Sequence, residues 1–203
     1  MKRILKLLLI TILLLIYSCD NTTTTSNPEE EQIDSEEDSE ESESTIRIMP
    51  LGASRVQGNR LNHESFRFEL WKDLIENGLA FDFIGTRTDQ ASYPTFNDTS
   101  FDIDHQGTSG WTSRQILDDI DNAINQAGVP DIVLFSSPGG NDALQQLPYD
   151  QAIDNINAII DALQEANPNI TIIIEQMAPG ASTNPAAAFF LTSIHQDVLA
   201  IAT

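Results

Sequence analysis

Hydrophobic residues recur through most of the chain with two spacings, one typical of strands and one typical of helices. Continuous apolar runs predict strands over residues 47–51, 80–84, 131–135 and 169–175. Apolar positions three and four residues apart predict helices over residues 65–77, 112–126, 149–166 and 185–202. Strands therefore alternate with helices, and this order favours a three-layer α/β/α fold with a parallel sheet.

One long polar stretch interrupts this alternation, at residues 87–110. Loops of that length in a compact domain are usually functional or lack fixed structure. Parallel α/β sheets bind their ligands beyond the carboxyl ends of the strands. The residues predicted to lie there are 52–54, the stretch 87–112 and residues 139–142.

The amino-terminal residues predict a targeting segment. A basic start, Met1–Lys6, precedes the apolar run Leu7–Ile16. Ten residues are too few to span a bilayer core of about 30 Å, so residues 1–18 are interpreted as a signal peptide. The run ends in Ile16-Tyr17-Ser18-Cys19, which resembles a bacterial lipobox. That resemblance implies lipidation of Cys19 and a bacterial cell-envelope location, at the outer membrane or the cell surface. The alternative is an ordinary secretory signal with an incidental cysteine.

The segment after Cys19 has the composition of a tether. Residues 20–45 contain 11 acidic residues, no basic residue and almost nothing apolar except Ile33. Such a segment cannot bury enough surface to offset its ordering entropy, and its like charges keep it extended. We therefore expect three parts: a signal peptide (1–18), a lipidated cysteine with an acidic tether (19–45) and one domain (46–203).

Composition excludes several classes of function. The net charge is −21, and no lysine or arginine follows Arg114. A basic patch that could displace counterions from phosphates is missing, so no nucleic-acid partner is expected. The single cysteine cannot form an intramolecular disulfide. The histidines His63, His105 and His195 are far apart and lack cysteine partners, so no metal site is predicted.

Three sequence blocks carry a family resemblance. They are Met49–Gly58, Asp104–Thr112 and Gly140-Asn141-Asp142, and each follows or adjoins a predicted strand or loop in the expected order. Together they resemble the SGNH (GDSL-type) hydrolases, and the second block resembles its form in carbohydrate-active members. The resemblance implies a flavodoxin-like SGNH-hydrolase fold for residues 46–203.

The resemblance also assigns candidate site residues. It implies that Ser54 is the nucleophile and that Gly110 and Asn141 belong to the oxyanion hole, together with the backbone N–H of Ser54. A serine directly after a strand and Gly52 sits on a tight turn at the sheet edge, which suits this role. Taken singly, these residues are also typical of a turn serine, a helix-entry glycine and a loop asparagine. His105 and Trp111 are substrate-binding candidates, although Trp111 is equally typical of a core residue.

Two features depart from the family pattern. The family usually has aspartate before the nucleophile, where this chain has Ala53. The family's general base is a histidine in a final Asp-x-x-His block after a fifth strand. No Asp-x-x-His occurs after the third block of this sequence, and the one match, Asp102-Ile103-Asp104-His105, overlaps the second block. We therefore expect a domain that lacks its last strand and helix, or else a natural degenerate product. The general base is expected to be absent from the chain.

The resemblance implies a serine esterase that removes acyl groups, most plausibly O-acetyl groups of polysaccharides, and that needs no cofactor. Lipid esters and thioesters are the less favoured substrates for such an esterase. Its partners would be an acylated carbohydrate or another small ester, and the membrane through the lipid anchor alone. Two alternatives remain open at this point: a non-catalytic glycan-binding or remnant domain, and a tethered surface domain with a protein partner.

Overall fold

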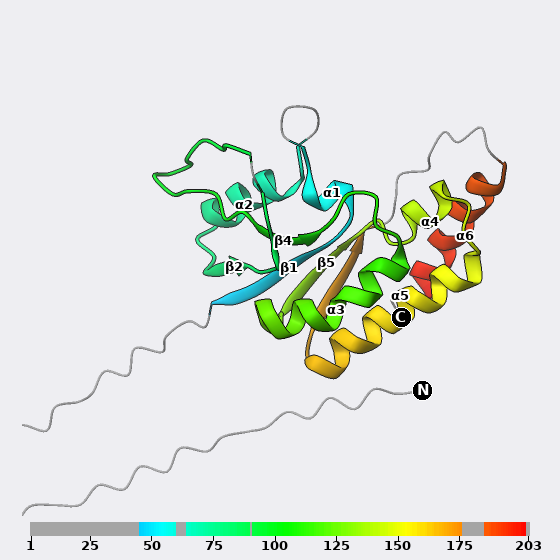
Figure 1. The fold of residues 1–203 in the computed structure, drawn as a ribbon. Coiled ribbons are helices and arrows are strands. Elements are labelled where there is room, and N and C mark those ends of the chain that lie inside the picture. The colour runs from blue at the N-terminus through cyan, green and yellow to red at the C-terminus, as the bar shows by residue number, and fades with distance from the viewer. Residues whose placement is uncertain (1–44, 60–63, 90, 176–184, 202–203) are drawn as a thin grey trace, which may run out of the picture. The chain divides into compact units, whose positions relative to one another are not determined.

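The computed structural model describes residues 45–59, 64–89, 91–175 and 185–201, and Figure 1 shows their arrangement. The predicted signal peptide, Cys19 and the tether lie outside the described residues. The strands are β1 (Ile46–Gly52), β2 (Phe81–Phe83), β3 (Arg87–Thr88), β4 (Asp104–Gly107), β5 (Ile132–Ser136) and β6 (Thr171–Glu175). The helices are α1 (Ser54–Gln57), α2 (Arg67–Glu76), α3 (Ser113–Ala127), α4 (Gly140–Leu144), α5 (Tyr149–Ala166) and α6 (Pro185–Ile201).

The strands form one sheet in the order β3-β4-β1-β5-β6, and β2 also pairs with β1. Every pairing is parallel except that of β3 with β4. β5 lies along one edge of β1, with Ile48 opposite Ile132. The other edge of β1 is shared, because β2 pairs with residues 46–48 and β4 with residues 51–52. The predicted parallel sheet is thus confirmed.

This division of one strand edge explains a proline in a central strand. The backbone groups of Ile46 and Ile48 point to the β2 edge, since Ile46 N–H donates to Ala80 and Ile48 C=O accepts from Ile84. Alternate residues of a strand in a parallel sheet point to opposite neighbours, so Pro50 also faces this edge. It lies between the residues that pair with β2 and those that pair with β4. Its missing N–H therefore costs no ladder hydrogen bond.

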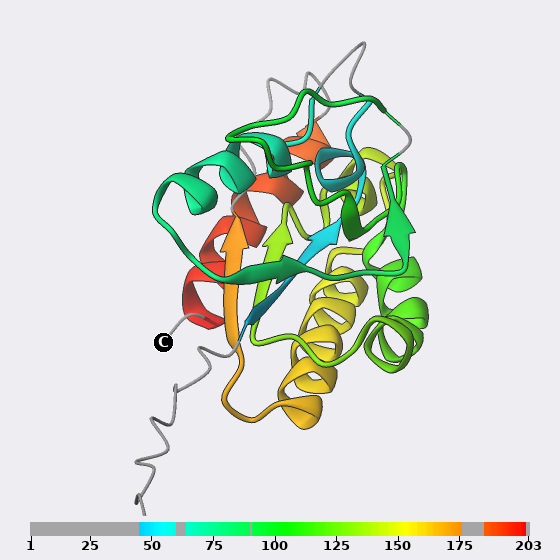
Figure 2. The same ribbon diagram turned by 90° about the vertical axis from the view of Figure 1, so that its left-hand side faces the viewer.

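Two hydrophobic clusters lie on opposite faces of the sheet, and the two views of the ribbon show helices on both sides (Figure 2). The larger cluster joins Met49, Leu51, Val133 and Phe135 to side chains of α3, α5 and α6. The smaller one joins β1 and β2 to α2 and to the segment before β4. Its buried members are Ile48, Phe68, Trp71, Phe83 and Phe101. The observed layers are those of the SGNH-hydrolase fold that the sequence predicts.

The structure differs from the sequence prediction in three places. The stretch predicted as one polar loop, 87–110, contains β3 and β4, and Phe101 anchors it in the core. The short helices α1 and α4 were not predicted, since four or five residues give no periodicity to detect. The continuous apolar run in β6 predicts burial on both faces, yet the Ile173 side chain is 53% exposed. No helix among the described residues has the length and hydropathy needed to cross a bilayer.

Candidate functional site

The site begins at a tight turn between β1 and α1. Gly52 ends the strand with a φ of +154°, and a Cβ on it would lie 2.9 Å from the carbonyl oxygen of Ser136. Only glycine fits such a close approach of two backbones without displacement. Ala53 precedes the first turn of α1, and Ser54 is its first residue. Ser54 is therefore half-buried at the start of α1, which follows the carboxyl end of the central strand β1. Figure 1 shows α1 directly after β1.

The loop after β4 is bonded directly to this turn. The backbone N–H of Thr108 donates to the carbonyl oxygen of Gly52 at 3.3 Å. The backbone N–H of Ser109 donates to the Gln57 side-chain oxygen at 2.6 Å. These bonds join the loop to residues on both sides of Ser54. The conformation of residues 108–111 is thereby coupled to the position of α1.

The same loop is bonded on its other side to α4. The Asn141 side-chain nitrogen donates to the carbonyl oxygen of Trp111 at 2.7 Å. The Gln145 side chain donates to the carbonyl oxygen of Gly110 at 3.3 Å. An amide group has two N–H donors, and the contact with Trp111 uses one of them. Gly110 is exposed with a φ of +83°, and a Cβ placed on it would meet nothing within 4 Å.

A buried polar network holds α4 against α3. Both carboxylate oxygens of Asp142 accept hydrogen bonds from Ser113, one from its N–H at 2.8 Å and one from its hydroxyl at 2.7 Å. The Asn155 side chain donates to the Ser113 hydroxyl oxygen at 3.0 Å. Asp142 is only 2% exposed and lies next to Asn141 in sequence. Because this carboxylate is bonded at both oxygens, it fixes the start of α4 and the backbone that carries Asn141.

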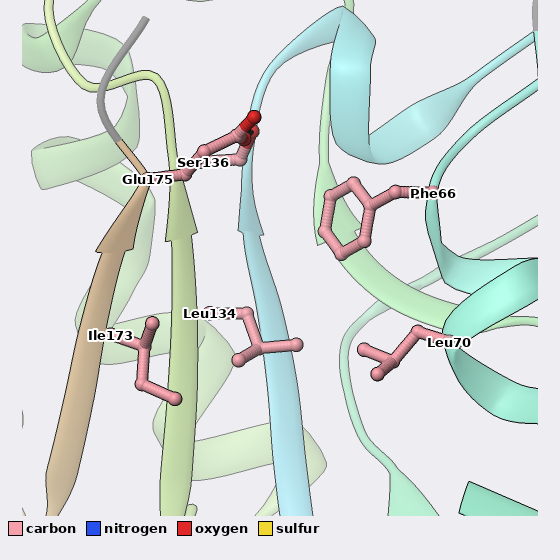
Figure 3. Close-up of a pocket in the computed structure, with 6 residues that line it drawn as sticks. All are labelled: Phe66, Leu70, Leu134, Ser136, Ile173 and Glu175. Atoms are coloured by element: carbon pink, nitrogen blue, oxygen red, sulfur yellow. Dashed lines mark hydrogen bonds between the residues drawn. The ribbon is translucent and has the colours of Figure 1, made fainter. Parts of the chain in front are cut away.

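A third group of contacts joins the ends of three strands. Arg55, directly after Ser54, forms an ion pair with Glu175 at 2.5 Å, and the hydroxyl of Ser136 also donates to Glu175. Ser136 and Glu175 line a pocket of about 280 Å³ whose walls are otherwise apolar (Figure 3). The apolar lining consists of Phe66, Leu70, Leu134 and Ile173. The pocket thus lies on the α2 side of β5 and β6, and Ser54, Gly110 and Asn141 do not line it.

Trp111 is half-buried at the end of this loop and packs against the larger core cluster. The Arg87 guanidinium lies over its ring, 5.0 Å from the ring centroid. Arg87 is held in turn by Asp119 at 2.9 Å and by the Thr108 hydroxyl at 3.0 Å. A guanidinium stacked on an indole is an attractive cation–π contact that restricts the ring. The indole is therefore partly a core side chain and partly accessible.

His105 is placed differently from the expectation of a loop residue that contacts substrate. It lies in β4, its side chain is 1% exposed, and its Nδ1 accepts the N–H of Gly107 at 3.1 Å. Burial, and then the positive charge of Arg67, lowers the pKa of His105 to about 3. The imidazole is thus neutral and enclosed, which corrects its assignment as a substrate-binding residue. His63 and the side chain of His195 lie outside the described residues.

The sequence analysis assigned no role to several residues that shape the site. Gln57 and Asp142 act through hydrogen bonds across the fold, and neither bond has a local sequence signal. Arg67 had a detectable signal, because it lies four residues before Trp71 on the apolar face of α2. Charged side chains are almost never fully buried unless they are paired. A basic residue on that face therefore indicates a buried ion pair.

Among the described residues, no group of three or more histidine, cysteine, aspartate or glutamate side chains is placed to hold a metal ion. Hydrogen bonds through the loop 108–111 join the segments that carry Ser54, Gly110 and Asn141 at the carboxyl edge of a parallel sheet. This fold and this grouping define a protein of the SGNH-hydrolase class.

Comparison with known proteins agrees with that class. Residues 66–201 match the GDSL-like Lipase/Acylhydrolase family, and the chain belongs to it. The matched range begins after Ser54. No curated protein matches the chain.

Solved esterase structures resemble the chain over most of its length. A family 3 carbohydrate esterase from Clostridium thermocellum is 31% identical, with a TM-score of 0.58 over 77% of this chain and 74% of that one. A family 3 carbohydrate esterase from Talaromyces cellulolyticus is 27% identical, with a TM-score of 0.61 over 75% and 72%. A serine-to-alanine mutant of an acetyl esterase with acetate ion is 26% identical, with a TM-score of 0.62 over 75% and 72%.

Proposed function

We propose that the protein is a serine esterase that removes O-acetyl groups from polysaccharides, with Ser54 as the nucleophile. The observation that carries this proposal is the loop 108–111. It is bonded to the Ser54 turn through Gly52 and Gln57 and to α4 through Asn141. Three groups suited to acyl transfer therefore lie on segments that are hydrogen-bonded to one another at the sheet edge.

Each group has a defined part in the proposed reaction. The Ser54 hydroxyl oxygen attacks the carbonyl carbon of the ester, and its proton passes to a base. Negative charge then develops on the carbonyl oxygen. The backbone N–H groups of Ser54 and Gly110 and the second N–H of Asn141 are the proposed donors to that oxygen. Backbone and amide donors keep this capacity at any physiological pH, because they do not titrate.

The choice of substrate rests on the neighbours and on Trp111. Two of the similar structures are carbohydrate esterases, and a third is an acetyl esterase with acetate ion. Trp111 follows Gly110 directly, and its partly accessible ring can stack on a sugar. Residues 16–19 support a location in the bacterial cell envelope through a lipid on Cys19. The proposed enzyme would thus act on polysaccharide outside the cytoplasm.

The base is the part of the mechanism that the described residues do not provide. His105 is buried and neutral, with a pKa lowered to about 3 by burial and by Arg67, so it is not available to take the Ser54 proton. Where no base takes this proton, we expect only the part of catalysis that the oxyanion donors and binding supply, roughly 10³–10⁴-fold over water.

The test compares acetate release from acetylated xylan by the 203-residue chain with that by Ser54→Ala, with and without added imidazole. Imidazole at millimolar concentration can act as an external base. We expect it to raise turnover by the wild type and to leave Ser54→Ala at the rate of imidazole alone. Ser193→Ala, in α6, is the matched control and keeps the wild-type rate. Equal rates for the wild type and Ser54→Ala in both conditions would exclude the proposal.

A further inference from the structure

Arg67 is the most deeply buried charged residue in the described part of the chain, and its hydrogen bonds lead to the turn that begins at Ser54. It is the first residue of α2, and its side chain is 0% exposed. Its guanidinium donates to four acceptors and lies 5.5 Å from the centre of the Phe101 ring. The acceptors are the carbonyl oxygens of Val56 (2.8 Å), Ile103 (3.2 Å) and Gln57 (3.4 Å) and the carboxylate of Asp89 (3.1 Å).

Two of these acceptors belong to α1, the single turn that begins at Ser54. The last carbonyl groups of a helix have no partner within the helix and need donors from elsewhere. Arg67 supplies two such donors, one to Val56 and one to Gln57. Gln57 is also the residue whose side chain accepts the N–H of Ser109. A shift of Gln57 would therefore displace the loop that carries Gly110 as well.

Asp89 makes the burial of this charge possible. Its carboxylate pairs with Arg67 and also accepts hydrogen bonds from the Tyr93 hydroxyl and from the N–H of Ala91. The Arg67 side chain in this pair is 0% exposed and that of Asp89 is 9% exposed. A dry, fully bonded pair holds one geometry, and removal of either partner leaves a buried charge without compensation. The pair thus connects the segment after β3 to the end of α1.

We propose that Arg67 is a positioning residue for Ser54: its guanidinium fixes the end of α1 and so sets the orientation of the serine at the start of that turn. The chemical part of this inference rests on the proposed function of Ser54, whereas the structural part does not. Lysine at this position keeps the charge, but one ammonium group on a flexible stem cannot reproduce the planar fork that reaches four acceptors. We therefore expect Arg67→Lys to restore the charge without restoring the orientation.

The chemical arm of the test measures phosphonylation of Ser54 by a fluorophosphonate, followed by intact mass. Two quantities are recorded, the rate constant of labelling and the fraction of molecules labelled at completion. A misplaced nucleophile lowers the rate constant, by up to about 100-fold for a displacement near 1 Å. A protein that is merely less stable loses labelled fraction but keeps the rate constant of its folded molecules.

Four variants complete this arm. Arg67→Lys and Asp89→Asn are expected to label slowly and to completion. Leu163→Ala destabilises the core beneath α5, and Arg114→Gln breaks an exposed ion pair with Asp118, so both keep the wild-type rate constant. Asparagine at position 89 retains an oxygen that can accept a hydrogen bond from Arg67. Asp89→Asn therefore provides the measurement of the labelling rate constant if Arg67→Lys does not fold. A wild-type rate constant in both Arg67→Lys and Asp89→Asn overturns the inference.

The structural arm decides the matter even if wild-type Ser54 is not labelled, an outcome that would count against the proposed function alone. Hydrogen exchange is measured at the amides of Val56, Gln57 and Gly58, which bond to Ala53 and Ser54. Faster exchange at these amides in Arg67→Lys or Asp89→Asn, with unchanged exchange in α5, supports the inference. Unchanged exchange at all three amides overturns it.

Discussion

The side-chain amide of Asn141 donates a hydrogen bond of 2.7 Å to the backbone carbonyl oxygen of Trp111. This bond crosses from α4 to the loop after β4, and the residue before Trp111 is the candidate oxyanion donor Gly110. One contact therefore fixes the relative position of two proposed oxyanion donors. It also orients the Asn141 amide, because the N–H that bonds to Trp111 determines the direction of the other.

Replacement of Asn141 by alanine is expected to lower kcat by about 10²–10³-fold, the usual cost of one lost oxyanion donor. Asn141→Asp is expected to be at least as damaging, since a carboxylate offers only acceptors and faces the Trp111 carbonyl oxygen. Steady-state kinetics on 4-nitrophenyl acetate with imidazole measures both. Asn122→Ala, on the exposed side of α3, is the control. A change confined to KM would contradict the role assigned to Asn141.

Two glycines of the site should respond differently to substitution by alanine. Gly52→Ala adds a Cβ 2.9 Å from the Ser136 carbonyl oxygen at a φ of +154°, so strain and a backbone clash act together. Gly110→Ala meets nothing within 4 Å, and only its φ of +83° is unfavourable, at about 1–2 kcal/mol. Thermal unfolding of the two variants is the measurement. We expect Gly52→Ala to have the lower Tm, and equal Tm values would contradict the close approach at Gly52.

Substitutions at Trp111 should separate sugar binding from core packing. Trp111→Phe keeps a ring that can pack against the core and stack on a sugar, whereas Trp111→Ala loses both contacts. The loss of stacking alone is expected to weaken binding by roughly 1–3 kcal/mol, the value for a base stacked on an aromatic side chain. We expect Trp111→Ala to raise KM for acetylated xylan more than KM for 4-nitrophenyl acetate, which carries no sugar. The ratio of the two KM values corrects for any general loss of stability. Equal increases for both substrates would assign Trp111 to the core alone.

The burial of His105 makes the stability of the folded protein depend on pH. The folded protein holds this imidazole neutral down to a pH of about 3, because burial and then Arg67 lower its pKa. The unfolded chain binds a proton at this residue below about pH 6.5. Stability therefore falls as the pH is lowered from about 6.5 toward 3, by at most about 1.4 kcal/mol per pH unit from this group.

Urea unfolding of the wild type and of His105→Gln at several pH values between 7 and 5 measures this contribution. The difference in unfolding free energy between the two proteins should shrink as the pH falls, since only the wild type loses stability through His105. His63→Gln is the control for a titrating histidine elsewhere in the chain. A difference that stays constant with pH would show that His105 is accessible to protons in the folded state.

Lipidation of Cys19 is tested independently of the domain. Expression in a Gram-negative host with a labelled fatty acid should label the wild type and place it in the membrane fraction. Cys19→Ser should lose the label and be found in the soluble fraction, because the sequence offers no second cysteine to acylate. Several acyl chains give lasting anchorage, whereas one is marginal. Membrane association that survives Cys19→Ser would point to an uncleaved apolar segment instead.

The sequence was informative where the signal is periodic or local. The long helices α3, α5 and α6 follow from apolar spacing, and the predicted bounds of α5 agree with the structure at both ends. The turn at Ser54 follows from a strand, a glycine and a serine in succession. β4 was not predicted, because Asp104–Gly107 is a polar strand with no apolar pattern and its partner strand β1 is distant in sequence. His105 was misplaced for the same reason, since the burial of a polar strand comes from what packs over it.

β6 ends the sheet on one side, and no strand of the described part of the chain pairs with its outer edge. Unpaired strand edges beside an exposed apolar side chain such as Ile173 favour pairing between molecules. Charge repulsion opposes such association, and this chain has a net charge of −21. The net charge of the chain therefore opposes association through this edge. Salt near 1 M, which reduces the Debye length to about 3 Å, weakens that repulsion and so favours association between copies of the chain.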